Sequence, residues 1–598
     1  MLPEGKGPSR RGRRLYPNDA LMSFEDDKIN LALSTLKEVE RRCLADTGWF
    51  KNVIPKVFGT NDPTPTKPLA EQLETQIILA DSQVCLALLT FLQQDFSGYL
   101  KCGWVLRKAW KVYQRVYKDI LVLYKEQIGE LQLPDPSSLT VTPAPSTPLD
   151  RTPSDAEWNI PESSNGKENN HFLKKSTSIN NGLASGSLWS SFGSLQSFAL
   201  PLHIFSSQSS IKNQQEINKE VVERLMGAVC FGYGLFQLGI SLLPPSLLKL
   251  CNILGFAANR QNGISCLMYS RLGVDMRAPL ATLALLWYHT IVRPFYAIDG
   301  TNVQAGVDSA SMLINESHKE FEKSALFLFF SGRVSRLNSD IKSALKSFKE
   351  AAENATQREL KLLSLHEVGW CHLIELDYCA AECVFTYLHS SSRWSKSFYA
   401  YLAAVCSGAC SGSQRSSTYT EMKDYIKRIP KATQLDEFLN RRSKYFPENL
   451  EEIKSRGIVY WKLLVFEMLY LWNALPSCST ENISRIISDC TSTVPQLDEP
   501  MVGLSNLILG CAYGISGQVE LAIDSFRKCL DKRSDLAPNA EDLHVSAFAQ
   551  YELGVLLLRT EETKAEGRLL LQGISQYTRY DFEQKLTVRV YSLLRQSS

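Results

Sequence analysis

The strongest constraint on the fold of this chain is the spacing of small and aromatic residues between Leu328 and Ala351, LFFSGRVSRLNSDIKSALKSFKEA. Gly332 lies in an apolar helical segment, Ala344 follows twelve residues later, and Phe348 follows four residues after that. Small residues on two antiparallel helices let the backbones approach closely, and an aromatic ring can then fill the space beside the contact. The spacing therefore predicts a helical hairpin.

The same spacing recurs, so we interpret the hairpin as a repeated unit. The offsets return in two further sets, Gly369, Ala381 and Phe385, and Gly510, Ala522 and Phe526. A fourth copy is degraded, because Gly554 fits but Glu566 takes the place of the small residue, with Ala565 and Gly567 beside it. The pattern resembles the tetratricopeptide repeat, a helix pair of about 34 residues. We assign repeats to residues 327–356, 364–393, 505–534 and 549–578.

Helical periodicity dominates the rest of the chain, and we find no convincing alternation of period two. The content of 44% hydrophobic and 21% charged residues is normal for a globular protein. We therefore predict an all-α fold in which tetratricopeptide-type helical hairpins stack into a right-handed superhelix, with a long disordered insert. The expected regions are a disordered tail (1–20), N-terminal helical repeats (21–133), the insert (134–215), apolar helical hairpins (216–300) and tetratricopeptide repeats (301–598).

The predicted insert is rich in Pro, Ser, Thr and Asn and has no periodicity, which is typical of a disordered segment. Three of its threonines precede a proline, as proline-directed kinases require: Thr142, Thr147 and Thr152. Its apolar residues are either a docking peptide or a short helix that packs on the body: Trp189, Phe192, Leu195 and Phe198.

The net charge, the cysteines and the apolar segments indicate the environment in which the chain works. The net charge of +2 gives no field that favours nucleic acid, and the mixed basic and aromatic stretch 104–124 fits a helix with one buried face and one solvated face. The fifteen cysteines are scattered through helical segments, so we expect reduced thiols in a cytoplasmic protein. Pro244 and Pro245 divide the apolar stretch 230–258 into pieces too short to span a membrane, and we expect buried helices there.

Several long strings carry a closer resemblance. They are FGYGLFQLGISLLPPSLLKLCNILGF (231–256), MRAPLATLALLWYHTIVRPFYAIDG (276–300), SRWSKSFYAYLAAVC (392–406) and YDFEQKLTVRV (580–590). Over about residues 20–595 the chain resembles the tetratricopeptide repeat protein 39 family. The resemblance implies an all-helical scaffold without a catalytic residue, in a family connected with cilium assembly and with sterol and lipid regulation.

No catalytic or metal-binding layout stands out. His366 and Glu367 begin a zincin-like string, but Trp370 occupies the place of the second histidine. Cys379 and Cys383 are one helical turn apart, which is not the spacing of a zinc knuckle, so we interpret them as core thiols. We therefore predict a protein that is not an enzyme and needs no cofactor or metal.

The functional surface is expected in the groove lined by the first helices of the repeats. Arg333 and Arg336, one and four residues after Gly332, are placed to hold a carboxylate of a partner peptide, and Trp370 is placed as an aromatic anchor. The alternative is that the arginines are solvated or paired with Asp340 or Glu320. We predict a scaffold for protein or peptide partners. The rival prediction is an interaction protein that docks peripherally on an organelle membrane through residues 230–258 or the insert.

Overall fold

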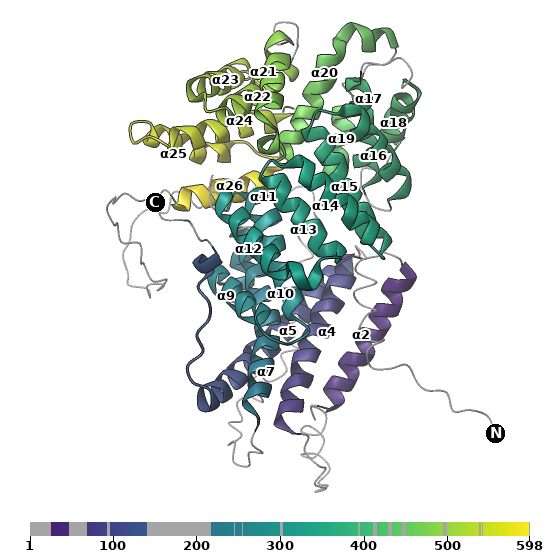
Figure 1. Ribbon diagram of the computed structural model, residues 1–598. Helices are drawn as coiled ribbons and strands as arrows, with labels where there is room; N and C mark the ends of the chain where they lie inside the picture. Colours follow the sequence, from purple (N-terminus) through teal and green to yellow (C-terminus); the bar gives the residue numbers. More distant parts are fainter. Residues whose placement is uncertain are drawn as a thin grey trace, which may run out of the picture. The chain divides into compact units, whose positions relative to one another are not determined.

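The computed structural model describes residues 26–46, 68–92, 96–139, 217–243, 245–253, 255–256, 258–298, 303–392, 395–410, 416–428, 433–444, 446, 450–493, 499–536, 540 and 542–596. Within these ranges the chain is helical and contains no β-strand (Figure 1). The predicted tail over residues 1–20 lies outside the described residues, as do residues 140–215 of the predicted insert with the three Thr-Pro sites.

The helices follow one another with short connections in most places. In chain order they are α2 (Asp26–Asp46), α4 (Leu69–Leu92), α5 (Phe96–Gln127), η2 (Pro136–Leu139), α7 (Lys219–Ser241), α8 (Pro245–Ile253), α9 (Arg260–Arg271), α10 (Ala278–Trp287), the π-turn η5 (Tyr288–Val292), α11 (Arg293–Tyr296), α12 (Gln304–Phe321), α13 (Ala325–Leu337), α14 (Ile341–Asn354), α15 (Arg358–Ile374), α16 (Tyr378–Ser391), α17 (Lys396–Ala409), α18 (Ser416–Arg428), α19 (Gln434–Ser443), α20 (Leu450–Leu471), η7 (Leu475–Ser477), α21 (Thr480–Thr493), α22 (Met501–Ile515), α23 (Val519–Lys532), α24 (Leu543–Leu557), α25 (Lys564–Gly573), η9 (Ile574–Gln576) and α26 (Glu583–Gln596).

The spaced glycines lie where the two helices of a hairpin meet. A Cβ atom added to Gly332 would lie 2.7 Å from the ring of Phe348, and one added to Gly510 would lie 2.4 Å from the ring of Phe526. Gly369 has the same relation to Phe385, at 2.7 Å. The small residues of the second helices are fully buried, with an exposed fraction of 0% at Ala344, Ala381 and Ala522. The same contact, a glycine of the first helix against a phenylalanine ring of the second, therefore occurs in the pairs α13–α14, α15–α16 and α22–α23.

The turns of the first two hairpins end in aspartates that start the next helix. Asp340 accepts a hydrogen bond from the backbone N–H of Ser343, and Asp377 accepts one from that of Ala380, each at 3.0 Å. Such N-caps satisfy donors that a helix start leaves unpaired and contribute about 1 kcal/mol each. The local sequence thus fixes where α14 and α16 begin.

The fourth hairpin differs from the expected register by one residue. Gly567, and not Glu566, meets the first helix: a Cβ added to Gly567 would lie 2.9 Å from the carbonyl oxygen of Gly554. Leu571 takes the place of the phenylalanine, 2.9 Å from a Cβ added to Gly554. Glu566 is exposed and pairs with Arg527. The longer turn between α24 and α25 moves the small-residue position one place along the chain.

The apolar region forms helices, of which α7 is largely buried, whereas the described side chains of α8 are intermediate or exposed. Helix α7 packs on α9 at two glycines, since a Cβ on either Gly234 or Gly263 would lie 2.8 Å from the backbone of the other helix. Helix α5 packs on α7, where Trp110 stacks on Tyr233 with ring centres 5.2 Å apart. The predicted regions before and after the insert therefore share one hydrophobic core. The insert also starts later than predicted, because η2 contacts α9 and α12.

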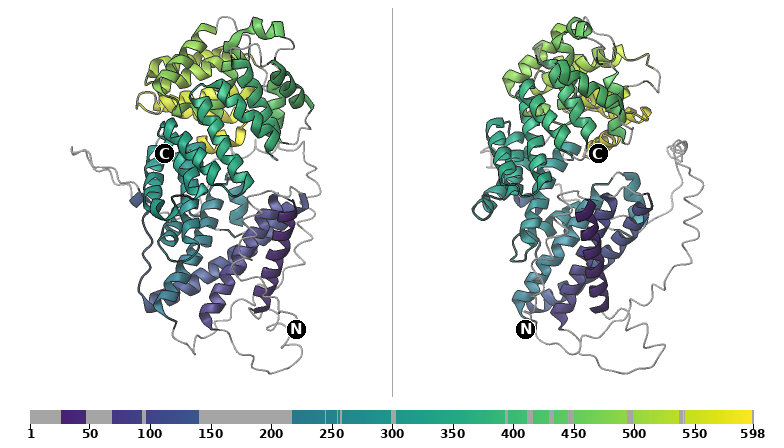
Figure 2. Two further views of the ribbon diagram at one scale, coloured as in Figure 1. Left: turned by 45° about the vertical axis from the view of Figure 1, so that its right-hand side comes forward. Right: turned by 90° about the vertical axis from the view of Figure 1, so that its right-hand side faces the viewer.

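Two described helices are long and apolar enough to cross a bilayer, Leu69–Thr90 within α4 and all of α7. However, 50% of the first apolar window and 61% of the second are buried against other helices. Figure 2 shows α2, in purple, beside α4, and the two helices also contact each other in the structure. This degree of burial is what the core helices of a helical stack show.

The last helix returns to elements from the middle of the chain. On α26, Arg589 donates hydrogen bonds of 3.0 and 3.1 Å to the carbonyl oxygen of Phe295. Lys585 donates to the carbonyl oxygen of Leu471, at the end of α20. The contact between residues 295 and 589 spans 294 positions of sequence.

A charged cluster is buried where α19, α20 and α24 meet. Arg442 is 0% exposed and donates to Glu467 and, at 2.8 Å, to Asp542. His544 lies 3.0 Å from the same Glu467 carboxylate. Burial alone would raise the pKa of Glu467, but Arg442 and His544 together outweigh burial and lower it to about 2. The side chains of Arg442, Glu467, Asp542 and His544 thus link α19, α20 and α24 through buried polar contacts.

Candidate functional site

Of the arginines assigned to the partner groove, Arg333 is partly buried and Arg336 is buried, and both pair with Glu367 of the next repeat. Arg333 lies 3.0 and 3.1 Å from the two carboxylate oxygens of Glu367, and its other terminal nitrogen donates to the carbonyl oxygen of Thr290. Arg336 is 4% exposed and pairs with the same carboxylate. The prediction that these arginines are open to a carboxylate of a partner is therefore wrong. Glu367, and neither Asp340 nor Glu320, holds them.

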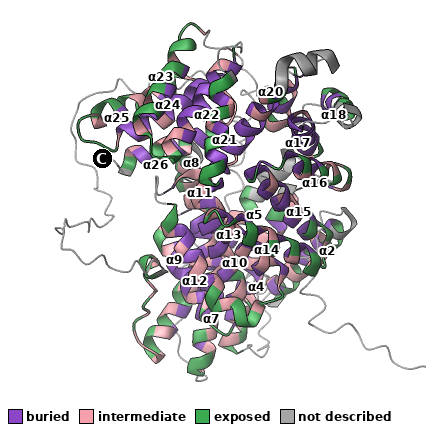
Figure 3. Cartoon of the chain, turned by 45° about the horizontal axis from the view of Figure 1, so that its top comes forward, coloured by how far each residue is buried: buried purple, intermediate pink, exposed green. Residues whose placement is uncertain are grey.

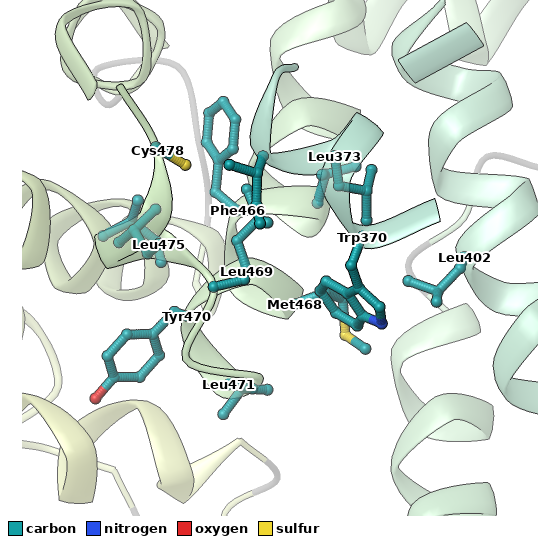
Figure 4. Packing of buried hydrophobic residues seen from close by; sticks show 14 of the residues in the cluster. Trp370, Leu373, Leu402, Phe466, Met468, Leu469, Tyr470, Leu471, Leu475 and Cys478 are labelled. Atoms are coloured by element: carbon teal, nitrogen blue, oxygen red, sulfur yellow. The ribbon is translucent and has the colours of Figure 1, made fainter. Parts of the chain in front are cut away.

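Trp370 is also buried, with 1% of its surface exposed. Its indole donates a hydrogen bond of 3.0 Å to Nε2 of His366 and stacks on Trp472 with ring centres 5.9 Å apart. Figure 4 shows Trp370 in the same buried cluster as Met468 of α20 and Leu402 of α17. The prediction of an exposed aromatic anchor is wrong, because side chains of α17 and α20 cover the face of α15 that the repeat pattern leaves open.

The buried Arg–Glu cluster predicts a pH dependence of stability. Burial would raise the pKa of Glu367, but Arg333 and Arg336 outweigh it and lower the pKa to about 2. The unfolded chain binds this proton near the ordinary pKa of 4.5, so the stabilisation is present above that pH and is lost as the pH falls toward 2. We expect the melting temperature of Glu367→Gln to change less between pH 5 and pH 3 than that of the parent, as measured by circular dichroism. If the melting temperatures of the parent and of Glu367→Gln change equally between pH 5 and pH 3, Glu367 is not the source of the pH dependence.

An open groove lies on another face of the stack, between α16 and α18. It has a volume of about 920 Å³, within the range of pockets that hold ligands or peptide side chains. Helix α17 contacts both α16 and α18 and is largely buried. Figure 3 shows exposed residues on α16 and α18 and buried residues along α17. We name this feature the α16/α18 groove. Eleven residues line it: Glu382, Cys383, Thr386, Tyr387, His389, Ser390, Glu421, Met422, Asp424, Tyr425 and Arg428.

The lining combines aromatic side chains with carboxylates. Tyr387 of α16 is 48% exposed, which is unusual for a ring of this size. Tyr425 of α18 packs against the edge of His389, with ring centres 4.5 Å apart. Met422 is buried and supplies an apolar surface. An exposed aromatic residue beside an apolar surface with a polar rim is the composition that protein-binding sites share.

One cysteine prediction is wrong near this groove. Cys379, at the start of α16, and Cys410, just after α17, form a disulfide with Cα atoms 5.8 Å apart. The other described cysteines form no disulfide. The prediction treated Cys379 and Cys383 as core thiols because they are one helical turn apart, but both are exposed. The spacing gave no sign of the disulfide, because Cys410 lies 31 residues from Cys379, beyond the next helix.

The sequence contains a weak signal for the α16/α18 groove. Within α16, Cys383 and Tyr387 lie four residues apart on one helical face, and both are exposed. A repeat pattern explains Ala381 and Phe385 on the buried face of this helix, but it gives no reason for an aromatic residue on the other face. The opposing wall, α18, follows a Ser/Gly-rich stretch and carries no repeat signature.

Comparison with families of known proteins supports the architecture. The model of one family, described as Iml2/Tetratricopeptide repeat protein 39, matches residues 17–513. The match covers every helix from α2 to most of α22, including the hairpins α13–α14 and α15–α16 with the glycine–phenylalanine contact and both walls of the groove. It thus spans most of the chain. The chain belongs to the Iml2/tetratricopeptide repeat protein 39 family.

Proposed function

We propose that this protein is a non-catalytic scaffold that holds a segment of another protein in the α16/α18 groove. The observation that carries the proposal is the groove itself, which stays open while the face predicted from the repeat pattern is filled by the chain's own side chains. A groove between two helices is suited to a helical or extended segment of a partner. Membership of a tetratricopeptide-type family supports protein binding as the activity.

A photo-crosslinking experiment tests this function. A photoreactive benzoylphenylalanine placed at Tyr387 should form adducts with partner proteins in cells, because this side chain lies in the groove and is 48% exposed. The matched control is the same group at Tyr591 of α26, which is also 48% exposed but is not part of the groove. Adducts found at Tyr387 and absent at Tyr591, identified by mass spectrometry, are the expected result. The same adducts from both positions would contradict a groove-specific role.

The cellular process is proposed from resemblance. Over about residues 20–595 the chain resembles tetratricopeptide repeat protein 39C, and from this resemblance we propose a role in cilium assembly. We propose that the scaffold acts in the cytoplasm, which the many buried cysteines without a disulfide partner support. Components of the cilium among the Tyr387 adducts would support this process, and a set of adducts without them would count against it.

Peripheral membrane binding is the less favoured alternative. The apolar residues of α7 that would have to enter a bilayer, among them Cys230, Phe236 and Leu238, are buried against α5 and α9. Ile253 of α8 is 82% exposed, but a single exposed apolar side chain needs no special explanation. Flotation of the full chain with liposomes would revive the alternative.

A further inference from the structure

We infer that the α16/α18 groove takes a segment rich in lysine or arginine, a partner class opposite in charge to the carboxylate ligand first predicted for this chain. The inference rests on the proposed function, because it names the kind of segment that the groove holds. Three features of the groove support it: the charges of its lining, the rings on its two walls and the exposed ion pair of Arg428.

Carboxylates outnumber cations along the groove. Glu421 and Asp424 lie three residues apart on α18, so they share a face of that helix, and both are exposed. Glu382 faces them from α16, where it is buried and already has an interaction within the chain. Arg428 is the lining residue with a permanent positive charge, and Lys423 and Lys427 of α18 are not among the lining residues. The groove therefore favours a positively charged occupant.

The ion pair inside the groove does not cancel the negative charge of the groove lining. Arg428 lies 3.8 Å from Asp424, and their side chains are 80% and 52% exposed. A pair this exposed contributes little to stability, because water and salt screen it and both side chains lose freedom when they pair. A lysine or arginine of a partner can therefore replace Arg428 beside Asp424 at small cost, and Glu421 forms no ion pair with another described residue that binding would have to break.

The rings of the groove suit the same occupant. Tyr387 and Tyr425 come from the opposite walls, α16 and α18, and an ammonium or guanidinium group is attracted to the face of such a ring. The methylene groups of a long basic side chain can pack on Met422 while the charge stays near the carboxylates. An acidic segment would meet like charges, and a purely apolar helix would desolvate Glu421 and the Asp424–Arg428 pair without adding a charge that compensates Glu421.

Binding of defined peptides to the full chain tests the inference. The probes are two fluorescein-labelled amphipathic helical peptides that are identical except that one carries lysine wherever the other carries glutamate. We expect the lysine peptide to bind, and Glu421→Lys/Asp424→Lys to weaken it on the order of tenfold by fluorescence anisotropy. The matched control is Glu350→Lys/Glu353→Lys on α14, which also reverses two acids three residues apart, one of them in an exposed i, i+4 pair. This control should bind like the parent, and added salt should weaken binding to both.

The outcomes separate the inference from the proposed function. Binding of the glutamate peptide that is lost in Tyr387→Ala would keep the groove as a peptide site but overturn the basic class. Equal weakening of the lysine peptide by the groove and control reversals would also overturn it, since the attraction would then be a property of the whole surface. If neither peptide binds in a way that Tyr387→Ala reduces, the inference and the proposed groove fall together. Matched helicity by circular dichroism shows that each variant is folded.

Discussion

Replacing Glu467 with alanine is expected to lower the free energy of unfolding by about 3–5 kcal/mol. The change leaves the guanidinium of Arg442 buried with Asp542 as an acidic partner, and it removes the carboxylate 3.0 Å from His544. The loss is costly because the desolvation of the guanidinium is then offset by one carboxylate in place of two. The measurement is urea denaturation followed by circular dichroism.

Two comparisons make this prediction specific. Glu353→Ala, which removes an exposed glutamate from α14, should change stability by less than about 0.5 kcal/mol. Arg442→Met/Glu467→Leu should cost less stability than Arg442→Met and Glu467→Leu added together, since the two single changes remove the same ion pair. Additive losses would show that this pair is not the source of the effect.

The second large effect is expected where the glycine and phenylalanine of a hairpin meet. Gly510→Ala should destabilise the protein by about 1–3 kcal/mol, although alanine is the better helix former, because its Cβ would lie 2.4 Å from the ring of Phe526. Phe526→Leu makes room for that methyl group. The double variant Gly510→Ala/Phe526→Leu should therefore lose less stability than the sum of the two single changes.

Gly514→Ala is the control for this cycle. It lies on the same helix, α22, but an added Cβ would have its nearest contact at 4.0 Å. We expect it to be neutral or slightly stabilising. Strict additivity of the Gly510 and Phe526 changes, or a loss in Gly514→Ala as large as in Gly510→Ala, would show that the close approach of α22 and α23 does not limit stability.

The hairpins could be predicted from sequence because their determinants are local. Gly332 and Phe348 are sixteen residues apart, and both ends of the contact belong to one repeat. The fourth hairpin shows the limit of this reasoning, since the extra turn residue between Gly554 and Gly567 changes the register without changing the helical pattern. Which small residue meets the partner helix then depends on the turn geometry, and the sequence pattern does not encode that geometry.

The partner site could not be predicted in the same way. The repeat pattern places Arg336 and Trp370 on the faces of α13 and α15 that such repeats usually leave open. Whether those faces stay open depends on α20 and on Trp472, which directly follows α20 and lies about a hundred residues beyond Trp370. The α16/α18 groove likewise depends on how two non-consecutive helices are spaced by α17, and no local motif reports that distance.

The return of α26 to the middle of the chain has a consequence for synthesis in the cell. Phe295 is translated 294 residues before Arg589, its hydrogen-bond partner. At typical translation rates of about 5–20 residues per second, that is a delay on the order of 15–60 seconds. The early hairpins can form during this time. The carbonyl groups of Phe295 and Leu471 have no contact with α26 until that helix is made, and the apolar surface that α26 covers stays exposed until then. The nascent chain in this interval is therefore the form of the protein with the greatest need for chaperones.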